Sequence, residues 1–179
     1  MGIKSLNKNE SYYNFFGASG LDAVNLHPYY LSWTGNRGVW QGGRTGSSYT
    51  DTIDYVDIPT PGDATDFGNL TDTRAYTASC SSGSRGVCMG GYDGSYKNVM
   101  DYITIATAGD STDFGNLSVT RRATGACSDR TGTRGCWGGG YTSGDSNVID
   151  YITIASPGDA TDFGDLTRDE QLVSSCSGD

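Results

Sequence analysis

The chain has 179 residues, of which 12 are basic and 21 acidic, and its formal net charge is −9. This length is enough for one or two domains with a buried core. The acidic balance argues against nucleic acids and anionic membrane surfaces as partners, because like charges repel. The only histidine is His27, which excludes a metal site built from several imidazoles and argues against a Ser-His-Asp triad.

The first 36 residues match no other part of the chain. Residues Met1–Ser5 begin no apolar run of the signal-peptide kind, and no stretch approaches the roughly 18 apolar residues of a membrane span. We therefore expect folding in a reducing cytoplasm and no membrane insertion. The segment Ser11–Gly17 gathers two tyrosines and two phenylalanines. Such a cluster is costly in water, so residues 1–36 are expected to dock on a partner.

From residue 37 onward the sequence repeats itself about every 48 residues, and four blocks return in the same order. The blocks are an arginine-led glycine segment (Arg37–Gly43, Arg85–Gly91, Arg134–Gly140), an aspartate–tyrosine pair (residues 54–55, 101–102, 150–151), a segment ending in Phe-Gly-x-Leu (Gly62–Leu70, Gly109–Leu117, Gly158–Leu166) and a cysteine ten residues later (80, 127, 176). The sequence thus predicts three repeats, 37–84, 85–133 and 134–179, after an arm of 36 residues.

Each repeat has the composition of short strands. Val148–Ile154, for example, is rich in β-branched and aromatic residues and ends at a Ser-Pro-Gly turn. Its apolar residues fall on both faces, which is typical of a strand buried between two stacked sheets. No window has helical periodicity. We expect an all-β fold of propeller-blade repeats, since repeats of this length with several strands are typical of blades.

The repeats resemble those of the kelch family. Thr73–Cys80 followed by Arg85–Gly91 and then Asp101-Tyr102 is similar to the kelch order of an arginine-led strand, a strand ending in Gly-Gly and a later tyrosine. Phe67 stands about where kelch motifs have tryptophan. The wording of Ile149–Ala155 and Gly158–Thr167 looks like kelch-like repeats in virion proteins of marine tailed phages, including cyanophages.

That resemblance covers residues 37–179 and implies a structural or fibre protein of a virus particle, made in the host cytoplasm. It implies no catalytic residues and no cofactor. We expect partners to be other molecules of the same chain, other virion proteins bound through residues 1–36, and a host glycan. The alternative is a cellular carbohydrate-binding or adhesion module, and the third possibility is a degenerate propeller enzyme.

Three blades are fewer than the 4–8 of closed propellers. The sequence has one extra strand of the first type, Gln171–Ser177, after the last full repeat. An unpaired strand can pair with another chain. We expect it to complete a blade with the Arg37 strand, either of the same molecule or of a neighbour in a homo-oligomer. An open stack of sheets is the alternative.

Each repeat places one arginine in its glycine strand and one aspartate in the next strand. These residues are Arg37, Asp54, Arg85, Asp101, Arg134 and Asp150. A charge that recurs inside apolar strands indicates a partly buried ion pair or hydrogen bonds to neighbouring backbone. The functional alternative is a ring of carboxylates that lines a central channel.

The Asp-Phe-Gly segments and the cysteines are interpreted as structural. In the turns, aspartate is expected to accept backbone N–H groups. Asp63 and Asp66 could instead offer oxygen ligands to calcium, although the full spacing of a calcium loop is missing. The five cysteines include no Cys-x-x-Cys pair, so we expect free thiols and no zinc. No metal site is predicted.

The candidate binding residues are tyrosines in the variable loops after the Gly-Gly pairs. They are Tyr49, Tyr92, Tyr96 and Tyr141. Aromatic rings beside Asp and Asn side chains can stack on sugars and hydrogen-bond their hydroxyl groups, which predicts a glycan or host-surface contact. The alternative is that these rings only cover glycine-rich turns or contact neighbouring subunits.

Overall fold

The structure is a computed structural model and describes residues 36–177. The chain divides into two units, Met1–Thr34 and Gly35–Asp179. The arm predicted for residues 1–36 therefore lies outside the described residues, except for Asn36. Within residues 36–177 no helix is long and apolar enough to span a membrane.

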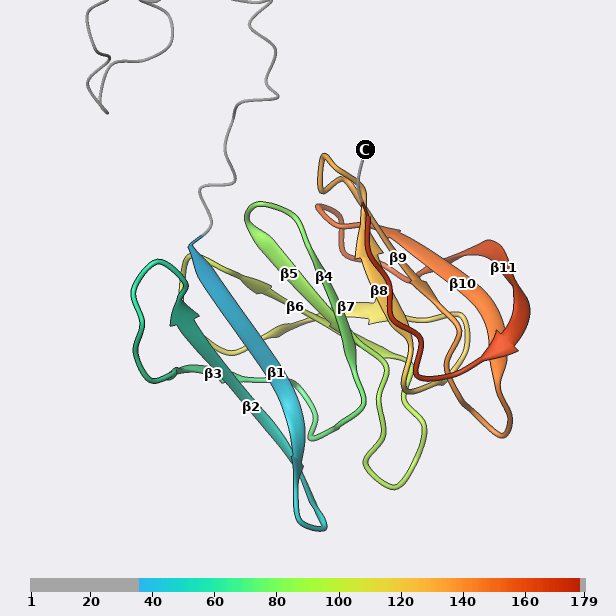
Figure 1. The fold of residues 1–179 in the computed structure, drawn as a ribbon, viewed down its shortest axis with the longest axis horizontal. Helices are drawn as coiled ribbons and strands as arrows, with labels where there is room; N and C mark the ends of the chain where they lie inside the picture. Colours follow the sequence, from blue (N-terminus) through green and yellow to red (C-terminus); the bar gives the residue numbers. More distant parts are fainter. Residues whose placement is uncertain (1–35, 178–179) are drawn as a thin grey trace, which may run out of the picture. The chain divides into compact units, whose positions relative to one another are not determined.

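The described chain is all-β, as predicted, and its strands form three antiparallel sheets (Figure 1). The first sheet contains β1 (Arg37–Thr45), β2 (Ser48–Asp57) and β3 (Thr65–Asn69), the second contains β4 (Ala78–Ser81), β5 (Arg85–Met89), β6 (Val99–Thr104) and β7 (Thr112–Asn116), and the third contains β8 (Gly125–Ser128), β9 (Arg134–Gly138), β10 (Ser146–Thr153) and β11 (Thr161–Glu170). In each sheet, neighbours along the chain are also neighbours in space. In the second and third sheets the first strand, β4 or β8, comes before the arginine that opens the corresponding repeat, Arg85 or Arg134. Each of these strands therefore belongs, in sequence, to the preceding repeat.

Apolar side chains fill the space between consecutive sheets. One cluster joins Ile53 and Phe67 of the first sheet to Cys88 and Ile103 of the second. The other joins Met89 and Phe114 of the second sheet to Trp137 and Ile152 of the third, among others. The second sheet is therefore buried on both faces, which explains why its strands have apolar residues at consecutive positions.

Close backbone contacts reinforce this stacking at the Asp-Phe-Gly segments, which lie within β3 and β7 and not in turns as predicted. The N–H of Gly109 donates to the carbonyl of Phe67 over 2.6 Å, and Gly158 does the same to Phe114. Gly68 has φ +145°, and a Cβ built on it would lie 2.5 Å from the Gly109 backbone. Glycine is needed there both for its backbone conformation and for the close approach of the next sheet.

A second column of hydrogen bonds runs through Tyr76, Ala123 and Leu172, which occupy corresponding positions of the three repeats. All three have positive φ, between 57° and 59°. The N–H of Ala123 donates to the Tyr76 carbonyl, and the N–H of Leu172 donates to the Ala123 carbonyl. This column places residues 171–177 beside β8, where Ser175 Oγ also donates to the Ala126 carbonyl. In Figure 1 the C-terminal segment runs next to β8.

The first sheet has three strands, and within residues 36–177 β1 pairs only with β2. The extra segment Gln171–Ser177 is thus on the third sheet and does not pair with the Arg37 strand of its own molecule. The prediction that it closes a blade within one chain is wrong for this structure, because the Leu172 hydrogen bond fixes it at the opposite end of the stack.

Candidate functional site: a tyrosine and arginine cluster

The four loop tyrosines predicted as binding residues lie next to one another at one end of the sheets. Tyr49 is the second residue of β2 and so lies in a strand, whereas Tyr92 and Tyr96 follow β5 and Tyr141 follows β9, as predicted for loops. Their ring centroids are 5.9 Å apart for Tyr49–Tyr92, 5.3 Å for Tyr92–Tyr96 and 5.8 Å for Tyr96–Tyr141. Segments from all three sheets therefore contribute to one row of rings.

Two arginines and a fifth tyrosine complete this tyrosine cluster. The Arg122 guanidinium lies 4.7 Å from the Tyr92 centroid and 5.5 Å from that of Tyr141, within the range of cation–π attraction. It also lies 5.1 Å from the ring of Tyr76. Arg44 donates a hydrogen bond to the Tyr76 hydroxyl. The four loop tyrosines are half-buried and Tyr76 is exposed.

Local turns hold the rings in place. Tyr92 and Tyr96 face each other across an antiparallel bridge, and Tyr141 is bridged to Arg122. The turn between Tyr92 and Tyr96 contains Gly94 at φ +123°, and Asp93 Oδ1 accepts a hydrogen bond from the N–H of Ser95. A tight turn with an aspartate acceptor and a glycine at positive φ is what the Asp-Gly sequence favours.

Charged groups surround the cluster. Lys97 makes ion pairs of 2.7 Å with both Asp72 and Asp93. The hydrogen bond from Lys97 lowers the pKa of Asp93, and the hydrogen bonds to Asp72 and Asp93 raise the pKa of Lys97. The hydrogen bond to the Tyr76 hydroxyl raises the pKa of Arg44. These groups are charged near neutral pH, so the rings have both cationic and anionic neighbours.

Sequence reasoning identified four rings of this cluster but missed Arg122, Arg44 and Tyr76. One signal was present: Arg122 directly follows Arg121 in an Arg-Arg pair that the other repeats lack. Neighbouring residues of an extended chain point in opposite directions, so one arginine of such a pair is directed away from the core. The rows of ring faces, guanidinium groups and carboxylates suit a polar ligand with flat apolar faces.

The predicted pairing of arginine and aspartate inside each repeat needs correction. Asp101 receives its ion pair from Arg74, at 2.7 Å, and Asp150 receives its pair from Arg121, at 2.8 Å. All four side chains are fully buried. Each arginine comes from the segment that leads into the sheet, which sequence spacing alone did not indicate.

Arg37, Arg85 and Arg134 instead lie over tyrosine rings. Their guanidinium carbons are 4.4, 4.3 and 4.4 Å from the centroids of Tyr55, Tyr102 and Tyr151. Two of them also reach the next sheet, since Arg37 donates to the Ile105 carbonyl and Arg85 to the Ile154 carbonyl. The expectation of hydrogen bonds to neighbouring backbone describes these two arginines, while the expectation of ion pairs with Asp54, Asp101 and Asp150 does not.

The buried ion pairs are structural contacts. Asp101 also accepts from the hydroxyl and the N–H of Thr71, and Asp150 from the same groups of Ser118. Burial lowers the pKa of Arg121, while Asp150 acts in the opposite direction. A buried ion pair is stable only when such additional hydrogen bonds satisfy its charges. These carboxylates lie inside the stack and do not line a channel.

The loop aspartates of the third block also join sheets. Asp110 accepts from the N–H of Asn69 at 3.0 Å, and Asp159 from the N–H of Asn116 at 2.9 Å. Asp63 and Asp66 of the first repeat are exposed. Within residues 36–177 no group of three or more metal-ligating side chains could hold an ion. The calcium alternative gains no support from this geometry.

The cysteines are free thiols. Cys80 and Cys88 are buried, Cys127 and Cys136 are half-buried, and Cys176 is exposed. Cys80 lies opposite Val87 in the β4–β5 ladder, while Cys127 lies opposite Cys136. Burial raises the pKa of the Cys80 and Cys136 thiols, so the reactive thiolate form is disfavoured at both positions.

Comparison with known proteins gives no family for this chain. No protein-family model matches it, and no curated protein is significantly similar to it.

Proposed function

We propose that this protein is a non-enzymatic structural component of a virus particle, built from kelch-like repeats and acting in assembly and host-surface attachment. The sequence resemblance described above supports the class. The tyrosine cluster carries the proposal of attachment, because it is a row of rings to which all three sheets contribute. The particle partners are other molecules of this chain and other virion proteins, the latter bound through residues 1–36.

The proposed ligand of the tyrosine cluster is a glycan. Sugar rings have an apolar face that stacks on aromatic side chains and hydroxyl groups that hydrogen-bond charged side chains. Tyr96 and Tyr141 supply adjacent faces, while Arg122 and Asp145 supply a donor and an acceptor near the same loop. The binding energy expected from half-buried rings of this kind is modest, so affinity at a host surface would depend on several molecules acting together.

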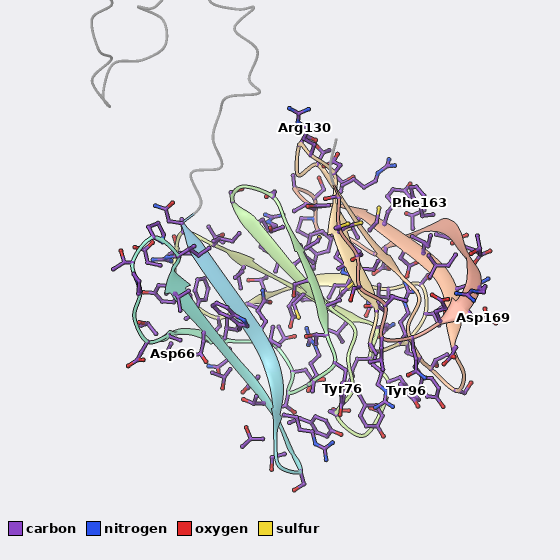
Figure 2. The ribbon with its side chains drawn as sticks, in the orientation of Figure 1. Asp66, Tyr76, Tyr96, Arg130, Phe163 and Asp169 are labelled. Atoms are coloured by element: carbon purple, nitrogen blue, oxygen red, sulfur yellow. The ribbon has the colours of Figure 1, made fainter. Side chains whose placement is uncertain are left out.

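The test is a glycan array followed by saturation-transfer NMR on the sugars that bind. Tyr96→Ala and Tyr141→Ala together should reduce binding at least about tenfold, which corresponds to about 1.4 kcal/mol. Phe163→Ala is the matched control, because it removes an exposed ring far from the tyrosine cluster (Figure 2). If no glycan binds, or if the tyrosine double variant and Phe163→Ala lose glycan affinity equally, attachment through this surface is contradicted.

The second candidate is a cellular carbohydrate-binding or adhesion module. The same tyrosine cluster favours it, because a sugar contact of this kind is independent of any particle. The two candidates differ in where the protein is found: the proposed virion component should co-purify with particles, and the adhesion module should remain with cell surfaces. Mass spectrometry of both fractions distinguishes them.

A further inference from the structure

The outer face of the third sheet has the same Phe-Gly segment through which the first and second sheets pack against the next sheet, but here that segment is uncovered within residues 36–177. Phe67 and Phe114 are 3% and 2% exposed because the next sheet covers them, whereas Phe163 at the corresponding position is 55% exposed. Figure 2 shows Phe163 at the outer side of the third sheet. A Cβ on Gly68 would touch the next sheet, but a Cβ on Gly164 would have no atom within 4 Å.

A segment outside any strand, residues 171–177, lies beside this face. The hydrogen bond from the Leu172 N–H to the Ala123 carbonyl positions residues 171–177. In the same way, the hydrogen bond from the Ala123 N–H to the Tyr76 carbonyl positions the segment that leads into β8. The strand β8 pairs with β9, but no strand of residues 36–177 pairs with 174–177. Leu172 is also 74% exposed. Within residues 36–177, no three-stranded sheet pairs with residues 174–177 or covers Phe163.

The first sheet of a second molecule has the required shape, since it consists of three strands with β1 at its edge. The face of the first sheet that points away from the second sheet, called the front face below, also has exposed apolar side chains, with Trp40 at 59% and Ile58 at 66%. The outer face of the third sheet is called the rear face. In shape and hydrophobicity, the front face of one molecule thus fits the rear face of another.

The charges do not fit. Arg74 and Arg121, each four residues after the leucine of its Phe-Gly block, make the buried pairs with Asp101 and Asp150. The residue at this position in the third repeat is Glu170, which forms an ion pair with the exposed Arg168 of its own strand.

A second position shows the same change. Asn69 and Asn116 donate to Asp110 and Asp159 of the next sheet, and the corresponding residue of the third repeat is Asp165.

A second molecule docked in this way would place Asp54 opposite Glu170 and Asp63 opposite Asp165. Two ionised carboxylates in one desolvated contact repel each other, and neither would have the arginine or amide donor that the inner sheets supply. Like-charge contacts of this kind exclude a partner that would otherwise fit. The rear face is therefore closed to an identical molecule at neutral pH.

We propose that the outer face of the third sheet, together with residues 171–177, is a docking surface for a three-stranded sheet of a different protein. That sheet carries Arg or Lys where the inner sheets carry Asp101 and Asp150, so that the cation meets Glu170. The surface continues the interfaces already present between the three sheets, with the sign of the buried pair reversed. This inference rests on the proposed assembly role, and it implies that identical molecules associate through another face.

The test gives the front of this protein the charge that the partner is inferred to have. Wild-type protein at neutral pH should show no front-to-rear association by sedimentation equilibrium. The variant Asp54→Arg with Asp63→Asn should gain mass, because the new guanidinium meets Glu170 of the next molecule. Adding Glu170→Arg to this variant should return the mass to that of the wild type.

A second pair of variants tests the surface from the other side. Glu170→Arg with Asp165→Asn makes the rear face chemically like the inner ones and should also produce front-to-rear association with the unchanged Asp54. If neither charge-altered protein gains mass, the faces are not complementary and the proposal is wrong. Association of the wild type that is lost in Phe163→Asp would equally overturn it. Glycan binding measures a different surface, so its failure leaves this result unaffected.

Discussion

The inner and outer faces of the stack are built from the same sequence blocks but have opposite surroundings. Phe114 is buried between the second and third sheets, and Phe163, in the same Asp-Phe-Gly segment of the next repeat, is more than half exposed. Asp101 and Asp150 have arginine partners, whereas within residues 36–177 Asp54 has none. A residue in this protein is thus buried according to whether another sheet packs against its side of the sheet, and the comparison predicts unequal effects for equal substitutions.

The largest difference is expected for the aspartates. Asp101→Ala leaves the buried guanidinium of Arg74 without its carboxylate, which should cost about 3–5 kcal/mol of unfolding free energy. The melting temperature should fall by roughly 10 °C or more. Asp54→Ala is the matched control and should change it little, because that side chain is only half-buried. Calorimetry of both variants measures the difference, and an unchanged melting temperature for Asp101→Ala would remove the argument for a structural pair.

The phenylalanines should show the next effect. Phe114→Ala removes a ring from the core between two sheets and should cost about 3–4 kcal/mol. Phe163→Ala removes an exposed ring and should cost less than about 1 kcal/mol. Urea unfolding of the two variants gives both values, and equal losses would mean that Phe163 is covered in solution.

The glycines of the same blocks separate backbone strain from steric contact. Gly115 and Gly164 have φ of +138° and +136°, so alanine is equally strained at both. A Cβ on Gly115 would also lie 2.5 Å from the Gly158 backbone, with no such contact at Gly164. Gly164→Ala should cost about 1 kcal/mol from backbone conformation alone, and Gly115→Ala clearly more. Similar stabilities of the two variants would contradict the close approach of the sheets.

The smallest effect concerns the loops of the tyrosine cluster. The hydrogen bond from Lys97 lowers the pKa of Asp93 below its usual value near 3.9. The ion pair therefore stabilises the folded loop above the pKa of an unfolded aspartate, and this contribution is lost as the pH falls through the folded value. Lys97→Met should return the pKa of Asp93 toward the ordinary value, as measured by NMR titration. An unchanged pKa would mean that this contact does not form in solution.

Much of the fold follows from sequence patterns. The β-branched run Val148–Ile154 predicted a strand, and the structure has β10 at Ser146–Thr153. The prediction that this strand is buried between two sheets is wrong, because within residues 36–177 the third sheet packs only against the second. The Asp-Phe-Gly segments, predicted as turns, lie inside β3, β7 and β11. Of the four tyrosines predicted in loops, Tyr92, Tyr96 and Tyr141 lie between strands, whereas Tyr49 lies in β2. The strand prediction succeeds because β-branching and the turn residues at the ends of a strand act over a few neighbouring residues.

The partners of charged side chains could not be predicted in the same way. Asp101 was assigned to the arginine of its own repeat, but Arg74 of the lead-in segment reaches it across 27 residues. Arg85, which is closer in sequence, lies instead over the ring of Tyr102. Both arrangements are compatible with the spacing, and only the packing of the chain selects one of them.

The sequence by itself thus determined the all-β class and strands such as β10, since these depend on local backbone preferences and hydrophobic pattern. The tertiary structure alone decided which faces are buried, which arginine meets which aspartate, and where residues 171–177 lie. These properties depend on contacts between residues far apart in the chain. The sequence shows that Glu170 replaces arginine and Asp165 replaces asparagine in the third repeat. Their consequence follows only from the structure, because the inner contacts Arg74–Asp101 and Asn69–Asp110 show that an aspartate faces each of these positions.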